Sequence, residues 1–221
     1  MLKRKAYQDL LAWKRRSQGS TALLIEGARR VGKSTLACEF GENEYDTCLV
    51  IDFFQAPQEV KEYFSGLLSD LDTLFLYLST FYGIELHERR SLIIFDEVQM
   101  CPAARGAIKY LVADGRFDYI ETGSLLSIRR NVENIVLPSE EEVLELNPLD
   151  FEEFLWAMGQ SQLADLIKSR FAALEPLPDA LHRKAAGLLR EYMLVGGCRS
   201  RLMCTSRKGN SSRSMPRSAA Y

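Results

Sequence analysis

A glycine-rich stretch near the N-terminus carries the residues best suited to chemistry. It fits the pattern G-x-x-x-x-G-K-[ST], whose glycines let the backbone curl so that its N–H groups surround phosphate oxygens. The following helix directs the positive end of its dipole at the same anion. The matching residues are Gly27, Ala28, Arg29, Arg30, Val31, Gly32, Lys33, Ser34 and Thr35. The pattern predicts that they bind a nucleotide, with Lys33 at its β- and γ-phosphates and the Ser34 hydroxyl on Mg²⁺.

The residues around this loop favour a nucleotide site over a chance match. Thr21–Glu26 is an apolar run typical of a buried strand that enters the loop. Leu36, Ala37 and Phe40 then continue as a helix. A strand, a glycine-rich loop and a helix in this order are the context in which the pattern binds phosphate.

Two adjacent carboxylates, Asp96 and Glu97, follow a second apolar run, Ser91–Phe95. Ligands of open α/β sheets bind at the carboxyl ends of the strands, so we expect this pair beside the metal held by Ser34. Asp96 would help to hold Mg²⁺, and Glu97 would act as general base for, or orient, the attacking water. A solvated loop is the alternative, but the position downstream of a phosphate loop favours catalysis.

Polar residues also end the next predicted strand. Tyr119–Thr122 is typical of a strand that stops at Gly123, which places Thr122 and Ser124 at the same edge of the sheet. A hydroxyl there would sense the γ-phosphate or the attacking water, and we favour Thr122 over Ser124. A simple Thr-Gly-Ser turn is the alternative.

A phosphoryl-transfer site usually needs an arginine for the transition-state charge, supplied by its own chain or by a neighbouring subunit. The candidates by position are Arg105, Arg116, Arg129 and Arg130. Each is more typical of a solvated surface, so none is assigned this role.

The motifs favour ATP hydrolysis over two related reactions. Ras-like GTPases need an Asn/Thr-Lys-x-Asp signature and an Asp-x-x-Gly motif, and neither occurs. Small-molecule kinases generally lack adjacent Asp and Glu at this strand, because water must not attack the γ-phosphate. ATP and Mg²⁺ are therefore the expected ligands.

Apolar runs and helical stripes alternate along the chain, which predicts the α/β fold class. Further strands are expected at 48–53 and 142–146, and helices before the first strand, after Pro57, from Leu71 and over about 103–112. Strands separated by helices imply a doubly wound parallel sheet, as in P-loop NTPases.

The pattern changes at Asn147-Pro148. Asp150 can cap the next helix together with Glu153, and helical stripes continue to Tyr192. We predict a P-loop core over 1–148, a small lid-like helical subdomain over 149–197 and a disordered basic Ser/Arg-rich tail over 198–221.

The composition of the chain argues against several classes of protein. The 221 residues are 47% hydrophobic and 26% charged, with no apolar run near the roughly 18 residues of a membrane helix and no secretion signal. Five cysteines have neither metal-site spacing nor the density of a disulfide scaffold, which favours a cytoplasmic location. The net charge of −2 combines +6 on residues 198–221 with −8 elsewhere, which argues against a large nucleic-acid face on the body.

Four segments together resemble the bacterial and archaeal AAA-superfamily ATP-binding proteins, in which a P-loop domain precedes an uncharacterised C-terminal domain. They are GARRVGKST, LIIFDEVQMCP, ARGAIKYLVADGRFDYIETGSLL and LNPLDFEEFLWAMG, and the similarity covers about residues 3–197. The resemblance implies an ATPase core of the AAA/ASCE type. By position it assigns nucleotide binding to the loop residues Gly27, Gly32, Lys33, Ser34 and Thr35, and Mg²⁺ and water to Asp96 and Glu97.

The end of the chain departs from this family. Tyr192 to Gly197 keeps the family's Tyr-x-x-x-Gly-Gly, but the expected Pro-containing motif and long C-terminal region do not follow. We expect that the chain is truncated and that residues 198–221 are a frameshifted reading of the gene. The alternative is a natural basic arm that touches nucleic acid or anionic lipid.

Three functions remain open at this point. The first is Mg²⁺-dependent ATP hydrolysis coupled to a conformational change in a protein partner, in a homo-oligomer or in the missing C-terminal domain. The second is a nucleotide-gated binding module or switch with little turnover. The third, a DNA-associated ATPase, is favoured only by the basic tail.

Overall fold

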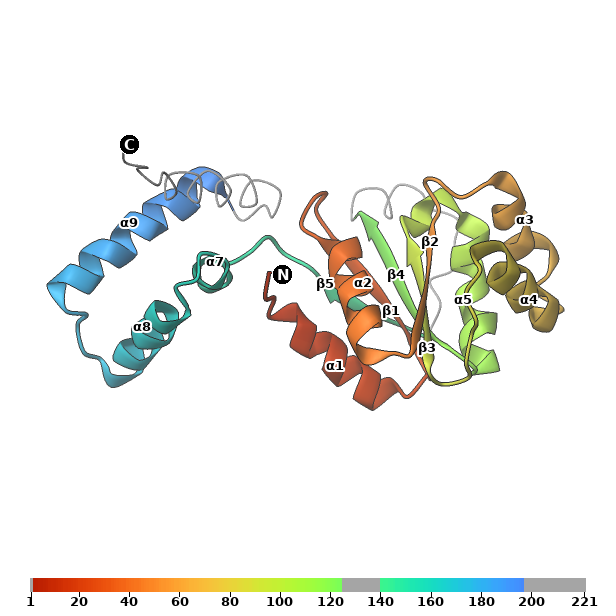
Figure 1. Cartoon of the computed structure of the whole chain (residues 1–221), viewed down its shortest axis with the longest axis horizontal. Coiled ribbons are helices and arrows are strands. Elements are labelled where there is room, and N and C mark those ends of the chain that lie inside the picture. The colour runs from red at the N-terminus through yellow and green to blue at the C-terminus, as the bar shows by residue number, and fades with distance from the viewer. Residues whose placement is uncertain (1, 125–139, 197–221) are drawn as a thin grey trace, which may run out of the picture. The chain divides into compact units, whose positions relative to one another are not determined.

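The computed structural model describes residues 2–124 and 140–196 (Figure 1). Of the described residues, 5–124 and 140–147 form one compact unit, and 2–4 with 148–196 form a second. Arg129, Arg130 and the predicted tail over 198–221 lie outside the described residues.

The first unit is built on a five-stranded parallel sheet with the strand order β2-β3-β4-β1-β5. The strands are β1 (Ala22–Gly27), β2 (Thr47–Asp52), β3 (Ser91–Asp96), β4 (Asp118–Ser124) and β5 (Glu141–Glu145). The central strands β1, β3 and β4 are buried almost throughout, which explains their continuous apolar runs. The edge strands β2 and β5 are only partly buried.

Helices cover both faces of the sheet (Figure 1). One face carries α1 (Ala6–Ser17) and α2 (Lys33–Glu44), and the other carries α3 (Gln58–Gly66), α4 (Leu71–Tyr82) and α5 (Pro102–Asp114). Alternate residues of a strand supply the two layers, because side chains point to opposite faces with a period of two. In β3, Leu92 and Ile94 pack with α1 and α2, whereas Ile93 and Phe95 pack with α3, α4 and α5.

This arrangement confirms the predicted doubly wound α/β fold. The predicted strands all occur, and the helix expected over 103–112 extends over Pro102–Asp114. A short 3₁₀ helix, η1 (Val98–Met100), joins β3 to α5 and was not predicted. The strand after the phosphate loop in sequence, β2, lies at the edge, and β4 is the strand that separates β1 from β3.

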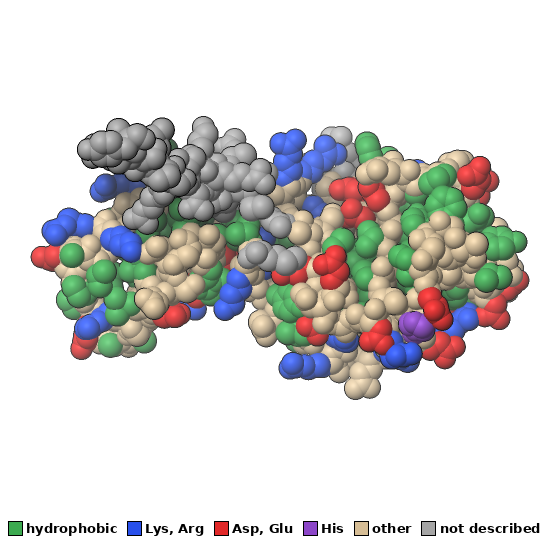
Figure 2. Space-filling view, in the orientation of Figure 1, with side chains coloured by type: hydrophobic (Ala, Val, Ile, Leu, Met, Phe, Trp, Pro, Cys, Tyr) green, Lys and Arg blue, Asp and Glu red, His purple; other side chains and the backbone are tan. Residues whose placement is uncertain are grey.

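Apolar side chains gather over α3 and α4 on the visible surface (Figure 2). The exposed ones include Leu76, Tyr77 and Phe81 of α4, while Leu74, Phe75 and Leu78 of the same helix are buried against the sheet. α4 is therefore apolar beyond its buried face.

The second unit contains α7 (Phe151–Ala157), α8 (Ser161–Ala173) and α9 (Asp179–Val195). The predicted capping box is confirmed: Glu153 N donates to Asp150 Oδ1 at 2.8 Å, and Asp150 N donates to Glu153 Oε2 at 3.1 Å. Residues near the N-terminus contact this unit, since Leu2 packs with Leu149 and Phe154, and Arg4 pairs with Glu153 at 3.2 Å. Within residues 2–124 and 140–196, no helix has the length and apolar character needed to cross a membrane.

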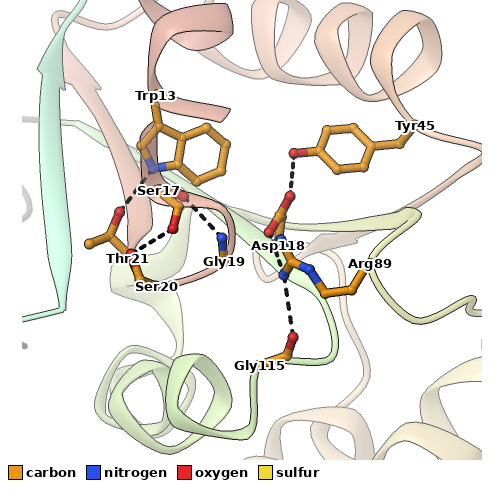
Figure 3. A network of polar contacts seen from close by, with 9 residues as sticks. All are labelled: Trp13, Ser17, Gly19, Ser20, Thr21, Tyr45, Arg89, Gly115 and Asp118. Atoms are coloured by element: carbon orange, nitrogen blue, oxygen red, sulfur yellow. Dashed lines mark hydrogen bonds and ion pairs between the residues drawn. The ribbon is translucent and has the colours of Figure 1, made fainter. Parts of the chain in front are cut away.

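Polar contacts join the segments at the amino ends of the strands (Figure 3). Asp118, the first residue of β4, accepts hydrogen bonds from Tyr45 Oη at 2.7 Å and from Arg89 at 3.0 Å. Nearby, Trp13 of α1 donates its indole N–H to Thr21 Oγ1 at 3.2 Å, just before β1 begins. A carboxylate that is 4% exposed and has two donors is costly to remove, because the Tyr45 hydroxyl loses its acceptor and the Arg89 side chain keeps only the carbonyl oxygen of Gly115 among the described residues.

We expect Asp118→Ala to lower the free energy of unfolding by about 2–3 kcal/mol, because it leaves the buried hydroxyl of Tyr45 without its acceptor and removes the charged partner of Arg89. The matched control is Asp46→Ala, which removes the Arg90–Asp46 pair at 2.7 Å from a mostly exposed position and should cost less than about 1 kcal/mol. Urea unfolding followed by circular dichroism measures both. Equal losses for the two variants would contradict the role given to Asp118.

Candidate nucleotide-binding and catalytic site

The carboxyl ends of β3, β4 and β1 lie in one row, since these parallel strands are neighbours in that order. The loop after β1 contains the G-x-x-x-x-G-K-[ST] residues and leads into α2. β3 ends at Asp96, and Thr122 lies near the end of β4. Three segments far apart in sequence thus meet at one edge of the sheet.

Two glycines shape the phosphate loop. A Cβ on Gly27 would lie 2.2 Å from the carbonyl oxygen of Leu146, so no other residue fits without a backbone shift. Gly32 has φ of 100° and forms the N-cap of α2, with no side chain capping the helix. The first N–H groups of α2 are therefore left for another acceptor, and a phosphate at a helix N-terminus is the usual one.

Lys33 curls back over the loop. Its Nζ donates to the carbonyl oxygens of Gly27 at 3.1 Å and Ala28 at 2.9 Å, and the residue is 6% exposed. Burial lowers the pKa of Lys33, while the carboxylates of Glu97 and Asp96 raise it. The ammonium group thus lies close enough to both predicted acids for their charges to act on it.

Asp96 joins two hydroxyls. Ser34 Oγ donates to Asp96 Oδ1 at 2.6 Å, and Thr122 Oγ1 donates to the same oxygen. A hydroxyl and a carboxylate in contact are hard oxygen donors of the kind that Mg²⁺ binds beside a nucleotide. No cluster of three or more His, Cys, Asp or Glu among the described residues could hold a metal alone. This pair fits Mg²⁺, which usually keeps water and substrate phosphates as its other ligands.

Glu97 has a strained backbone. Its φ is 52°, in the left-handed region, which costs a residue with a Cβ about 1–2 kcal/mol. Its N–H donates to Thr122 Oγ1 at 3.3 Å, so the hydroxyl of Thr122 contacts both predicted acids. Strain of this kind is frequent at active sites.

Gln99 is a residue that the sequence analysis missed. It is 8% exposed, and its side-chain amide donates to Glu97 Oε2. It belongs to the segment LIIFDEVQMCP, but an amide two residues after an acid has no chemical signature of its own. Only the fold reveals the contact.

The remaining predicted loop residues differ in exposure. Arg29 and Arg30 are exposed, Val31 is buried in the α2 layer, and Thr35 is half-buried. Ser124, the weaker candidate on β4, is buried.

Arg105 corrects the expectation that the arginine candidates are solvated. It is 1% exposed and pairs with Glu121 at 2.6 Å and Glu141 at 2.9 Å, which join α5 to β4 and β5. A guanidinium held in this way is not available to a phosphate. Arg116 is also engaged, because it pairs with Asp72 and Asp114.

Two carboxylates share this one buried guanidinium, which perturbs their ionisation. Burial, and then the neighbouring Glu141, raise the pKa of Glu121 from 4.5 to about 8 against the opposing effect of Arg105. One oxygen of Glu121 has no hydrogen-bond partner among the described residues. The protonated form of Glu121 leaves a neutral pair between Arg105 and Glu141, which suits a buried position.

Comparison with known proteins gives one family match. The sequence pattern of the AAA domain family matches residues 19–155. No curated protein matches the chain.

Several solved structures are similar to this chain at low identity. The Walker-type ATPase of Pyrococcus abyssi has 17% identity and a TM-score of 0.48, with 90% of this chain and 64% of that chain covered. The ORC1 protein of Aeropyrum pernix, solved in complex with DNA, has 17% identity and a TM-score of 0.48, with coverage of 100% and 63%. PCH-2 of C. elegans has 14% identity and a TM-score of 0.39, with coverage of 75% and 47%. The chain therefore spans less than two thirds of the length of each, and these similarities add nothing about activity or partners.

We expect Glu121→Gln to flatten the pH dependence of stability. A carboxyl whose folded pKa is raised binds more protons in the folded than in the unfolded state, so its stabilising effect is lost as pH rises from 4.5 to about 8. The wild-type chain should lose stability in this window by up to about 1.4 kcal/mol per pH unit, and the variant should lose less.

Urea unfolding at pH 5.5 and pH 8 measures this difference. Glu145→Gln, an exposed glutamate at the end of β5, is the control and should follow the wild type. A Glu121→Gln chain that is destabilised relative to the wild type equally at both pH values would contradict a protonated Glu121.

Proposed function

Because the chain belongs to the AAA domain family, we propose that it binds ATP with Mg²⁺ and hydrolyses ATP to ADP and phosphate. The observation that carries this proposal is the 2.6 Å hydrogen bond between Ser34 Oγ and Asp96 Oδ1. It brings the hydroxyl of the phosphate loop to the carboxylate that ends β3. These two groups serve Mg²⁺ in P-loop ATPases.

The phosphate loop and α2 would bind the nucleotide. The uncapped N–H groups at the start of α2 would donate to phosphate oxygens, and Lys33 would exchange its carbonyl partners for the β- and γ-phosphates. Ser34 and Asp96 would hold Mg²⁺, which when bound neutralises charge on the β- and γ-phosphate oxygens.

Glu97 would activate the attacking water. Its carboxylate would accept the proton as the water oxygen bonds to the γ-phosphorus and the bond to the bridging oxygen of ADP breaks. Thr122 supports this role, because its hydroxyl donates to the carboxylate of Asp96 and accepts from the backbone N–H of Glu97. It thereby holds both acids in place beside β4.

We further propose that hydrolysis is coupled to a partner, a homo-oligomer or a further domain, and that the protein is cytoplasmic. The alternatives to this function are a slow nucleotide-gated switch and a DNA-associated ATPase. The switch is separable from the enzyme by experiment, since it predicts nucleotide binding with negligible Glu97-dependent turnover.

We expect Lys33→Ala and Glu97→Gln to fail in different ways. Lys33→Ala removes the ammonium that meets the phosphates and should weaken ATP binding at least about tenfold. Glu97→Gln keeps the shape of the site but removes the base, so kcat should fall about 100-fold or more while ATP binding is retained.

Phosphate release with MgATP measures turnover, and titration with a fluorescent ATP analogue measures binding. Glu59→Gln, an exposed glutamate on α3, is the matched control and should keep both. Binding without any difference in turnover between the wild type and Glu97→Gln would refute hydrolysis and favour the switch.

A further inference from the structure

Gln99 makes a contact that the proposed mechanism does not use. It lies in the middle of η1, is 8% exposed, and donates its amide N–H to Glu97 Oε2. A buried amide that donates to a carboxylate limits the directions in which that carboxylate can point. The contact therefore bears directly on the acid proposed as the base.

The backbone of Glu97 is fixed by separate contacts. Its N–H donates to Thr122 Oγ1 at 3.3 Å, and its carbonyl accepts from Met100 N at 2.9 Å. These bonds hold the left-handed backbone conformation at φ of 52°. They do not fix the side-chain torsions, whereas the hydrogen bond from Gln99 restrains the carboxylate.

We propose that Gln99 is a positioning residue for Glu97, holding Oε2 so that Oε1 faces the water that attacks ATP. This inference rests on the proposed ATP hydrolysis and adds a residue to it. A neutral amide suits the task, because its N–H can orient the carboxylate through a hydrogen bond without placing a positive charge beside it.

Gln99→Leu removes the donor at similar size. It should lower kcat at least about tenfold, because misplaced catalytic groups lose rate steeply. It should leave ATP binding unchanged, since its partner Glu97 is proposed to act on the attacking water and not on the phosphates. Gln99→His should restore part of kcat, because the Nε2–H of histidine can donate from a similar distance.

A double variant distinguishes positioning from general structural damage. If Gln99 acts through Glu97, then Gln99→Leu should change the residual turnover of a Glu97→Gln chain by less than about twofold. The matched control is Gln58→Leu, because Gln58 donates to Glu62 at 3.2 Å in an exposed pair on α3 and should affect neither turnover nor binding.

The outcomes separate this inference from the proposed function. If the wild type shows no Glu97-dependent phosphate release, the proposed function fails and Gln99 has no base to position. If phosphate release depends on Glu97 but Gln99→Leu keeps or raises kcat, the positioning role alone is overturned. The same holds if Gln99→Leu lowers turnover by the same factor in the wild-type and Glu97→Gln chains. If Gln99→Leu fails to fold, Gln99→His is compared with the wild type instead. A Gln99→His chain that binds ATP normally but has a kcat reduced more than about 100-fold would overturn the positioning role.

Discussion

One carboxylate oxygen, Oδ1 of Asp96, joins the strand ends that make the site. It accepts hydrogen bonds from Ser34, at the start of the helix after β1, and from Thr122 on β4. These contacts require the strand order β3-β4-β1 and the parallel direction of the strands, which bring the three segments together at the carboxyl ends of the strands. They also require the register, because a one-residue slip of β3 would turn Asp96 to the opposite face of the sheet.

The two faces of β4 carry different polar contacts, a hydroxyl hydrogen bond on one side and an ion pair on the other. Thr122 points to the α2 side, where Ile120 also packs, and Glu121 points to the α5 side, where it pairs with Arg105. The strand is thus restrained from both sides by buried hydrogen bonds. Because Glu121 and Thr122 are neighbours, the ion cluster with Arg105 and the proposed catalytic contact share the same segment of backbone. Their energetic contributions should not be additive.

Much of the architecture follows from the sequence. The central strands are continuous apolar runs because both faces are covered, and the phosphate loop has a specific pattern, so both were predictable. Asp96 and Thr122 could be placed at strand ends, although their contact depends on a strand order that local pattern does not encode. Burial of a charge depends on long-range packing, which is why Arg105 was expected at the surface and lies in the core instead.

Gln99 and the N-terminal residues were missed for a related reason. The amide of Gln99 meets Glu97 only because η1 turns the chain immediately after a left-handed residue, and no propensity predicts that turn. Residues 1–4 are too few for a periodic pattern, yet Leu2 packs with Leu149 and Arg4 pairs with Glu153. Contacts between short segments far apart in sequence are set by the fold as a whole.

The phosphate loop combines a buried ammonium group with an uncapped helix N-terminus, and both suit an anion. Burial lowers the pKa of Lys33, and its ammonium group donates to two carbonyl oxygens, which are neutral acceptors. No side chain caps the N-terminus of α2 at Gly32. A triphosphate would supply negative charge to the ammonium and acceptors to the free N–H groups, so binding would raise the pKa of Lys33. By linkage, protonated Lys33 then favours the bound state.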